Sequence, residues 1–213
     1  MLAVDISGSM DEKDMLLNNQ KATRLALVKQ VIGEFVERRQ GDRLGLILFG
    51  TQAYLQVPLT FDRKTVQTLL DETPIAIAGE KTAIGDAIGL TVKRLRKRPE
   101  NSRVLVLLTD GVNNAGEMKP LQAAELAVRE GIKIYTIGVG ADQQVIRGLF
   151  FNQTRNPSNL DEENLTRIAE TTGGHYYRAR DQKELEQIYA ELDRLEPVEQ
   201  ERETYRPVKA LYY

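Results

Sequence analysis

The sequence has 213 residues, of which 41% are hydrophobic, so it can bury one sizeable core and offers too little for two comfortable domains. Its 29 basic and 31 acidic residues give a formal net charge of −2, which argues against a whole-domain attraction to nucleic acid or anionic lipid. The absence of cysteine excludes disulfides, zinc–thiolate sites and a thiol nucleophile. We therefore expect one main domain whose partner is chosen by a local site.

A short apolar strand opens the chain and leads directly into three oxygen-bearing side chains. Residues 2–4 have the character of a buried strand. Asp5, Ser7 and Ser9 follow at alternate positions, and alternate residues of an extended segment point to one side. A carboxylate and two hydroxyls can therefore converge on one point, where Gly8 lets the backbone turn. The segment predicts part of a metal site.

The rest of the chain alternates between helical and strand patterns. Residues 11–19 are polar, and we expect a surface loop there. Amphipathic helices are expected over six ranges: 20–39, 62–71, 82–98, 120–130, 161–172 and 181–195. Strands are expected over five further ranges: 43–50, 53–58, 103–109, 132–140 and 175–177. The order predicts an α/β fold with a mainly parallel sheet, helices on both faces and residues 53–58 as an antiparallel edge strand.

Three further stretches bear on domain organisation. Residues 1–195 are expected to form the domain, and residues 196–213 to form a charged linker that leads to a membrane span outside this sequence. A solvated tail is the alternative for that linker. The first strand has almost no lead-in, so we expect the natural chain to extend before it. Residues 141–160 predict a long loop, whose apolar Leu149, Phe150 and Phe151 either dock a partner or pin the loop to the body.

Two more oxygen donors are expected beside the first motif. Asp110 follows an apolar strand, and Thr82 precedes a helix whose start belongs at the same edge, where open parallel sheets bind ligands. Each also has an ordinary structural explanation, since Thr82 stands where an N-cap would and Asp110–Gly111 is a common turn. Together with the first motif they make two carboxylates and three hydroxyls. This set suits Mg²⁺, disfavours zinc and leaves coordination positions open.

The pattern Asp5-x-Ser7-x-Ser9, followed by Thr82 and Asp110, resembles the metal-ion-dependent adhesion site (MIDAS) of von Willebrand factor A domains. The resemblance implies a doubly wound, Rossmann-like fold that binds Mg²⁺, with Mn²⁺ or Ca²⁺ as substitutes. It also implies that a protein partner completes the metal coordination with an Asp or Glu. Ser7 and Ser9 would be direct ligands, Asp5 and Asp110 would act largely through water, and Thr82 would bind either way.

Within that superfamily, four stretches resemble the bacterial aerotolerance-operon (Bat-type) membrane proteins: 82–87, 107–111, 135–140 and 168–174. The resemblance implies a domain anchored in the bacterial inner membrane that works with other Bat-type proteins and a MoxR-type ATPase. The domain would face the periplasm, with the cytoplasm as the alternative.

Two other functions compete with partner binding. A Mg²⁺-dependent phosphohydrolase of the haloacid-dehalogenase type also begins with an Asp after its first strand, but it needs a second carboxylate where this chain has Ser7. A scaffold domain that never uses its metal site is the other alternative. His175 lies far from the motif in sequence, and we expect it to be a packing or surface residue. The basic residues 93–98 are expected to be a solvated helix end.

Overall fold

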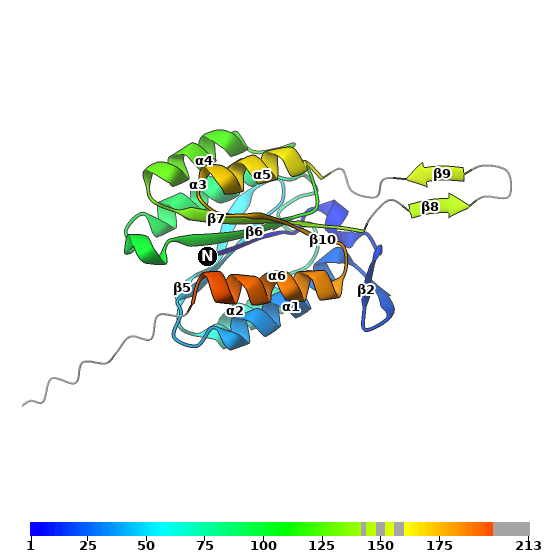
Figure 1. The fold of residues 1–213 in the computed structure, drawn as a ribbon, viewed down its shortest axis with the longest axis horizontal. Helices are drawn as coiled ribbons and strands as arrows, with labels where there is room; N and C mark the ends of the chain where they lie inside the picture. Colours follow the sequence, from blue (N-terminus) through cyan, green and yellow to red (C-terminus); the bar gives the residue numbers. More distant parts are fainter. Residues whose placement is uncertain (142–143, 148–151, 156–159, 198–213) are drawn as a thin grey trace, which may run out of the picture.

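The computed structural model describes residues 1–141, 144–147, 152–155 and 160–197. In these ranges a six-stranded sheet forms the middle layer, and helices cover both of its faces (Figure 1). The strand order is β10-β7-β6-β1-β4-β5, which places the first strand of the chain in the interior of the sheet. The expected α/β architecture is therefore confirmed.

The sheet strands are parallel except at one edge. They are β1 (Leu2–Asp5), β4 (Leu44–Phe49), β5 (Ala53–Thr60), β6 (Val104–Thr109), β7 (Lys133–Val139) and β10 (Tyr176–Ala179). Only the pairing of β5 with β4 is antiparallel among the described pairs of this sheet. The edge position suits β5 because Pro58 cannot donate a ladder hydrogen bond. The expected antiparallel edge strand is confirmed.

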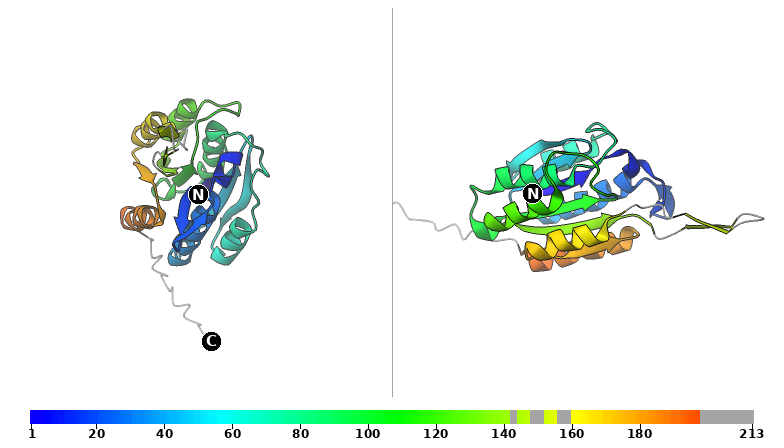
Figure 2. Two further views of the ribbon diagram at one scale, coloured as in Figure 1. Left: turned by 90° about the vertical axis from the view of Figure 1, so that its right-hand side faces the viewer. Right: turned by 90° about the horizontal axis from the view of Figure 1, so that it is seen from above.

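The six α-helices divide equally between the two faces in the described part of the chain. They are α1 (Arg24–Arg38), α2 (Arg63–Asp71), α3 (Ile84–Leu95), α4 (Pro120–Arg129), α5 (Glu162–Thr171) and α6 (Gln182–Leu195). Buried residues of α1, α2 and α6 share one core cluster, and those of α3, α4 and α5 share the other. The turned views in Figure 2 show the same two layers on either side of the sheet.

Both cores draw on the same strands. Leu2 and Val4 belong to the cluster beneath α1, whereas Ala3 belongs to the cluster beneath α3, because successive residues of a strand point to opposite faces. Each of these three side chains is at most 1% exposed. Burial on both faces explains why the central strands are continuous apolar runs.

The expected surface loop at residues 11–19 and the helix start at residue 20 were wrong. A 3-10 turn (Gly8–Asp11) is followed by an antiparallel hairpin of β2 (Met15–Leu17) and β3 (Gln20–Ala22). Asn18 and Asn19 have φ values of 50° and 64°, the left-handed conformation of a two-residue hairpin turn. Helix α1 begins only after Thr23, whose Oγ1 accepts a hydrogen bond from the amide of Ala26 at 3.1 Å.

The expected long loop at residues 141–160 contains two paired strands, so that prediction was wrong for part of its length. Strands β8 (Gln144–Arg147) and β9 (Asn152–Arg155) pair antiparallel. Residues 149–151 and residues 198–213 of the predicted linker lie outside the described part. Among the described helices, none combines the length and the apolar character needed to cross a membrane.

Candidate metal centre

The sheet topology brings the ends of β1 and β6 together. Val4 pairs with Leu108 of β6, and Asp5 pairs with Phe49 of β4, so Asp5 leaves the sheet between two neighbouring strands. Asp110 follows directly on the last residue of β6. Because all three strands run in the same direction, their carboxyl ends form one rim. The first motif and Asp110, 105 positions apart in sequence, therefore meet there.

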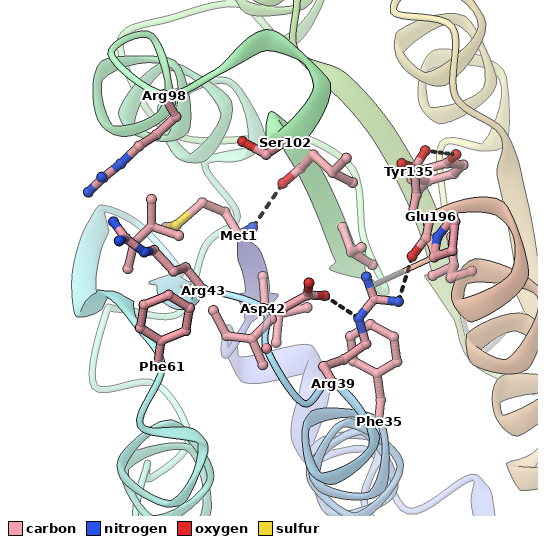
Figure 3. Close-up of a pocket in the computed structure, with 18 of the residues that line it drawn as sticks. Met1, Phe35, Arg39, Asp42, Arg43, Phe61, Arg98, Ser102, Tyr135 and Glu196 are labelled. Atoms are coloured by element: carbon pink, nitrogen blue, oxygen red, sulfur yellow. Dashed lines mark hydrogen bonds and ion pairs between the residues drawn. The ribbon is translucent and has the colours of Figure 1, made fainter. Parts of the chain in front are cut away.

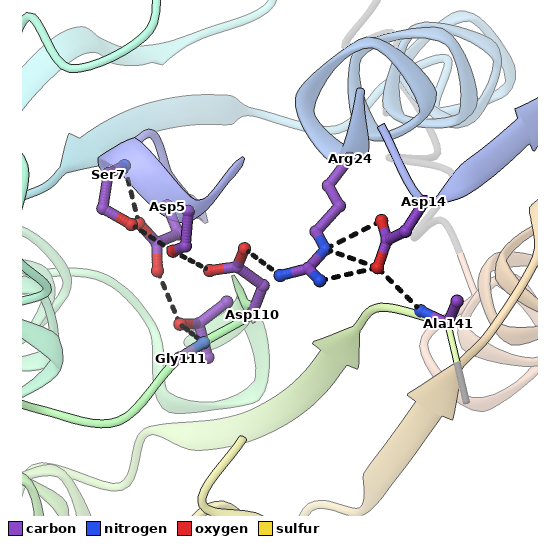
Figure 4. A network of polar contacts seen from close by, with 9 residues as sticks. Asp5, Ser7, Asp14, Arg24, Asp110, Gly111 and Ala141 are labelled. Carbon is purple, nitrogen blue, oxygen red and sulfur yellow. Dashed lines mark hydrogen bonds and ion pairs between the residues drawn. The ribbon is translucent and has the colours of Figure 1, made fainter. Parts of the chain in front are cut away.

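Hydrogen bonds join the side chains at this rim into one network (Figure 4). Asp5 Oδ1 accepts from the amide of Ser7 at 2.9 Å, and Asp5 Oδ2 accepts from Thr109 Oγ1 at 2.6 Å. Ser9 Oγ donates to Asp110 Oδ1 at 2.7 Å and lies 3.2 Å from Ser7 Oγ. Asp5 is thus linked to Asp110 through Ser7 and Ser9.

Thr82 reaches the rim from the start of α3. The amide of Ala83 donates to the carbonyl of Gly50, just beyond β4, at 2.8 Å, which fixes α3 at this edge. Thr82 Oγ1 lies 3.5 Å from the position that a Cβ on Gly111 would take. The N-cap explanation for Thr82 was wrong, because Ala83 is the N-cap residue and its side chain makes no cap bond.

The candidate ligands differ in their exposure to solvent. Asp5, Ser7, Thr82 and Asp110 are each at most 3% exposed, whereas Ser9 is exposed. Burial, followed by the nearby charge of Asp110, raises the pKa of Asp5 from 3.8 to about 7. Burial also raises the pKa of Asp110, although hydrogen bonds from Arg24 and Ser9 oppose this. Two buried carboxylates that repel each other call for a positive charge between them.

Sequence reasoning missed a buried arginine behind Asp110. Arg24, at the first position of α1, is 1% exposed, and its Nη1 donates to Asp110 Oδ2 at 2.7 Å. The same guanidinium holds Asp14, with Nη2 2.6 Å from Asp14 Oδ2, and the amide of Ala141 donates to that oxygen at 3.4 Å. An arginine that begins a helix looks like a surface residue, so no local signal could have identified it.

A second missed group braces Thr82. Asn114 Oδ1 accepts from the amide of Thr82 at 2.8 Å, and Asn113 Oδ1 accepts from the amide of Gly85 at 3.2 Å. In return, Asp86 of α3 accepts from the amide of Met118 at 2.9 Å. These bonds lock the loop after β6 to the start of α3. The adjacent Asn113 and Asn114, which follow Asp110–Gly111 after one intervening residue, were a usable signal, since asparagine side chains favour such turns.

The donor set fits a hard divalent cation. In the described residues no three His, Asp or Glu side chains are placed to share one metal ion, so a cation at this rim must also use hydroxyl ligands. A serine hydroxyl can donate its proton to a carboxylate and still present lone pairs to a metal. Asp5, Asp14 and Asp110 with Arg24 carry a formal charge of −2, which one divalent cation would balance.

A separate cavity lies at the opposite end of the parallel strands, where they begin (Figure 3). Its volume is about 430 Å³, and its lining includes Arg39, Arg43 and Phe61 but none of the candidate ligands. Exposed His175, just before β10, is also at this opposite end, so it takes no part in the rim. The candidate metal centre and this cavity are therefore separate sites.

Solved structures of other proteins share the fold of this chain. BatB from Bacteroides thetaiotaomicron is 28% identical, with a TM-score of 0.73 over 91% of this chain and 96% of that one. An aerotolerance-related membrane protein from Bacteroides fragilis is also 28% identical, with a TM-score of 0.69 over 89% and 97% of the two chains. A mussel byssus matrix protein, 23% identical with a TM-score of 0.69 over 91% and 44%, shares the fold, and its own structure has zinc in its MIDAS motif.

Proteins of similar sequence are known as well. An uncharacterized protein of Borreliella burgdorferi is 32% identical over 186 residues, which are 85% of this chain and 53% of that protein. The chain thus spans about half the length of the curated relatives it matches. The family model of the von Willebrand factor type A domain matches residues 1–191. With the parallel sheet and helices on both faces, this match shows that the chain belongs to the von Willebrand factor type A domain family.

Proposed function

We propose that the domain is a Mg²⁺-dependent protein-binding module. Its metal site consists of Asp5, Ser7, Ser9, Thr82 and Asp110, and an Asp or Glu of a protein partner completes the coordination. One observation carries the proposal: buried, mutually repelling carboxylates and clustered hydroxyls meet at a rim that is open to solvent beside Ser9. A cation at this rim would be held from below by the protein and would face a partner from above.

Some of these residues would bind the metal directly, and others would mainly supply negative charge. Ser7 and Ser9 would ligate the metal directly, because a hydroxyl keeps lone pairs for a metal even while it donates a hydrogen bond, as Ser9 does to Asp110. Asp5 and Asp110 would act largely through water and supply the balancing charge. Thr82 would bind directly or through water. With few direct protein ligands, an octahedral ion keeps positions that a partner carboxylate can take.

Magnesium is favoured over the alternatives by the all-oxygen donor set. Mn²⁺ and Ca²⁺ are possible substitutes, and the zinc in the mussel protein makes Zn²⁺ a necessary competitor in any binding measurement. Likeness to BatB and to the aerotolerance-related membrane protein supports the wider setting. In that setting the domain belongs to a membrane-anchored Bat-type complex in the bacterial inner membrane, faces the periplasm and works with a MoxR-type ATPase. Residues 196–213 would link domain 1–195 to the membrane.

Isothermal titration of the parent and of Asp5→Ala and Ser9→Ala variants with Mg²⁺ tests the metal site. We expect binding in the parent and at least about a tenfold loss of affinity in each variant. Ser102→Ala is a matched control, because Ser102 lies ahead of β6 at the other edge, where its hydroxyl donates only to Pro99 at 3.0 Å. Equal Mg²⁺ binding by Asp5→Ala and the parent would refute the site.

Partner capture from a bacterial lysate tests whether the metal site binds a protein. The proposal requires a bound protein that is lost with EDTA and with Ser9→Ala but kept with Ser102→Ala. If the same protein is captured in the presence of EDTA and by Ser9→Ala, the domain is instead a scaffold that leaves its metal site unused.

The phosphohydrolase alternative needs its own assay. We expect no Mg²⁺-dependent hydrolysis of a generic phosphoester, because Ser7 stands where that chemistry needs a general acid. Hydrolysis that disappears in Asp5→Asn would restore the enzyme hypothesis.

A further inference from the structure

The two carboxylates of the rim have little freedom to bind a cation through both oxygens. Asp110 Oδ1 accepts from Ser9 Oγ at 2.7 Å, and Asp110 Oδ2 accepts from Arg24 Nη1 at 2.7 Å. Asp5 Oδ1 and Oδ2 accept from the amide of Ser7 and from Thr109 Oγ1. All four oxygens are therefore already engaged. Three of the donors are neutral, and only the guanidinium of Arg24 brings a positive charge.

Arg24 is held so that it cannot easily leave Asp110. Its Nε donates to both oxygens of Asp14 at 3.0 and 3.1 Å, and its Nη2 donates to Asp14 Oδ2 at 2.6 Å. The side chains of Arg24 and Asp14 are 1% and 5% exposed. A planar guanidinium with two of its edges engaged in hydrogen bonds in this way is a rigid clamp. The clamp directs a charged donor at Oδ2 of Asp110 (Figure 4).

We propose that Arg24 is a positioning residue that makes the site selective for Mg²⁺ over Ca²⁺. Ca²⁺ takes about 6–8 oxygen ligands and readily uses a carboxylate through both oxygens, whereas Mg²⁺ is octahedral and uses single oxygens and waters. A cation that approached Asp110 Oδ2 would meet the guanidinium at short range. The clamp therefore leaves Asp110 one oxygen for the metal or its waters. This inference rests on the proposed metal site and adds the reason for its preference.

A charge-matched double variant separates the clamp from simple electrostatics. Arg24→Met with Asp14→Asn removes one positive and one negative side chain, so the formal charge of the cluster stays unchanged while Asp110 Oδ2 is released. Titration calorimetry with Mg²⁺ and with Ca²⁺ gives the ratio of the two dissociation constants. We expect the preference for Mg²⁺ to fall by about tenfold in the double variant relative to the parent. An unchanged ratio would overturn the inference.

A conservative single variant keeps the inference testable if the double variant does not fold. Arg24→Lys retains the charge but has no planar fork, so it cannot hold Asp14 and Asp110 in the same way. We expect a preference for Mg²⁺ between those of the parent and the double variant. A parental ratio in Arg24→Lys, with the double variant unfolded, would also overturn the inference.

Arg39→Lys is the matched control for loss of a buried arginine. Arg39 is 8% exposed and pairs with Asp42 and Asp193 at the opposite edge of the sheet. This variant should lower thermal stability without changing the ratio. A parent that binds no divalent cation would refute the proposed function and the clamp together. A parent that binds Mg²⁺ with an unchanged ratio in the clamp variants would refute the clamp alone.

Discussion

At the scale of single residues, the rim combines groups that conflict in the absence of a cation. Asp5 is fully buried, close enough to Asp110 to feel its charge, and hydrogen-bonded on both oxygens. The hydrogen bonds stabilise the ionised carboxylate, but burial outweighs them and raises the pKa of Asp5 to about 7. Removing that charge should therefore stabilise the metal-free protein and weaken the binding of the metal.

The Asp5→Asn variant should be more stable than the parent in EDTA near neutral pH. A carboxyl whose pKa rises on folding contributes stability that is full below its unfolded pKa and is lost as the pH rises through the folded pKa. For Asp5 that window runs from about 4 to about 7. The advantage of Asp5→Asn should therefore grow to more than about 1 kcal/mol between about pH 5 and pH 8, as measured by urea unfolding.

Adding Mg²⁺ should reverse the order of the two proteins. The parent should gain stability, and Asp5→Asn should gain little, because it has lost one of the charges that balance the cation. A parent that is the more stable protein in EDTA at about pH 8 would contradict the assigned environment of Asp5.

At the scale of elements, the helices α1 and α3 position residues of the candidate metal centre. Both begin at the rim: α1 starts with Arg24, and α3 starts two residues after Thr82. The N-terminal end of α3 is packed against the loop that follows β6. A Cβ added to Gly85 would lie 1.8 Å from the carbonyl oxygen of Met118. The position of Thr82 therefore depends on a backbone contact that only glycine allows.

Gly85→Ala should lower the free energy of unfolding by about 2–3 kcal/mol, because the obstructing atom belongs to the backbone. Gly89→Ala, one turn later, is the matched control. Its Cβ would meet only the flexible thioether of Met118 at 3.0 Å, so the gain in helix propensity should offset the contact to within about 1 kcal/mol. Chemical denaturation measures both. Equal costs for the two variants would contradict this account of α3.

The cap of α1 provides a test that separates stability from metal binding. Thr23→Ala removes the cap beside Arg24 and should cost about 1 kcal/mol. Asp62→Ala removes the cap of α2, where Asp62 Oδ1 accepts from the amide of Thr65 at 3.0 Å, and should cost about the same. Only Thr23→Ala should also weaken Mg²⁺ binding in calorimetry. A similar change in Mg²⁺ affinity for both variants would indicate a general loss of order.

At the scale of the whole molecule, the rim joins both helical layers to the middle of the sheet. Arg24 begins α1 on one face, Thr82 precedes α3 on the other face, and Asp110 extends β6 between them. A cation bound at this junction would stabilise elements from all three layers. We therefore expect metal binding to raise the stability of the domain as one cooperative unit.

Scanning calorimetry with and without Mg²⁺ checks this expectation. A ligand at 100 times its dissociation constant adds about 2.7 kcal/mol to the free energy of unfolding. For a domain of this size each kcal/mol raises the melting temperature by roughly 2–4 °C. The parent should shift upward in a single transition, and Ser9→Ala should not shift at the same concentration. Two transitions, of which only one responds to Mg²⁺, would show that the metal stabilises a part of the fold.

The sequence by itself determined the alternation of helices and strands and the edge position of β5. It also placed the five candidate ligands at strand ends or at the start of a helix. These features depend on periodicity within one element and on the rule that parallel strands end at one edge. They are local or topological, so they can be inferred without coordinates. Membership of the von Willebrand factor type A family agrees with them.

Only the tertiary structure decided which distant groups support the rim. Arg24 contacts Asp110 across 86 positions, and Asp14 contacts Ala141 across 127 positions, and neither contact leaves a periodic trace in the sequence. The hairpin β2–β3 was likewise hidden, because strands of three residues each are too short to show a clear alternating pattern. Long-range charge pairs and partly exposed hairpins depend on how layers pack, and packing is decided by the folded chain as a whole.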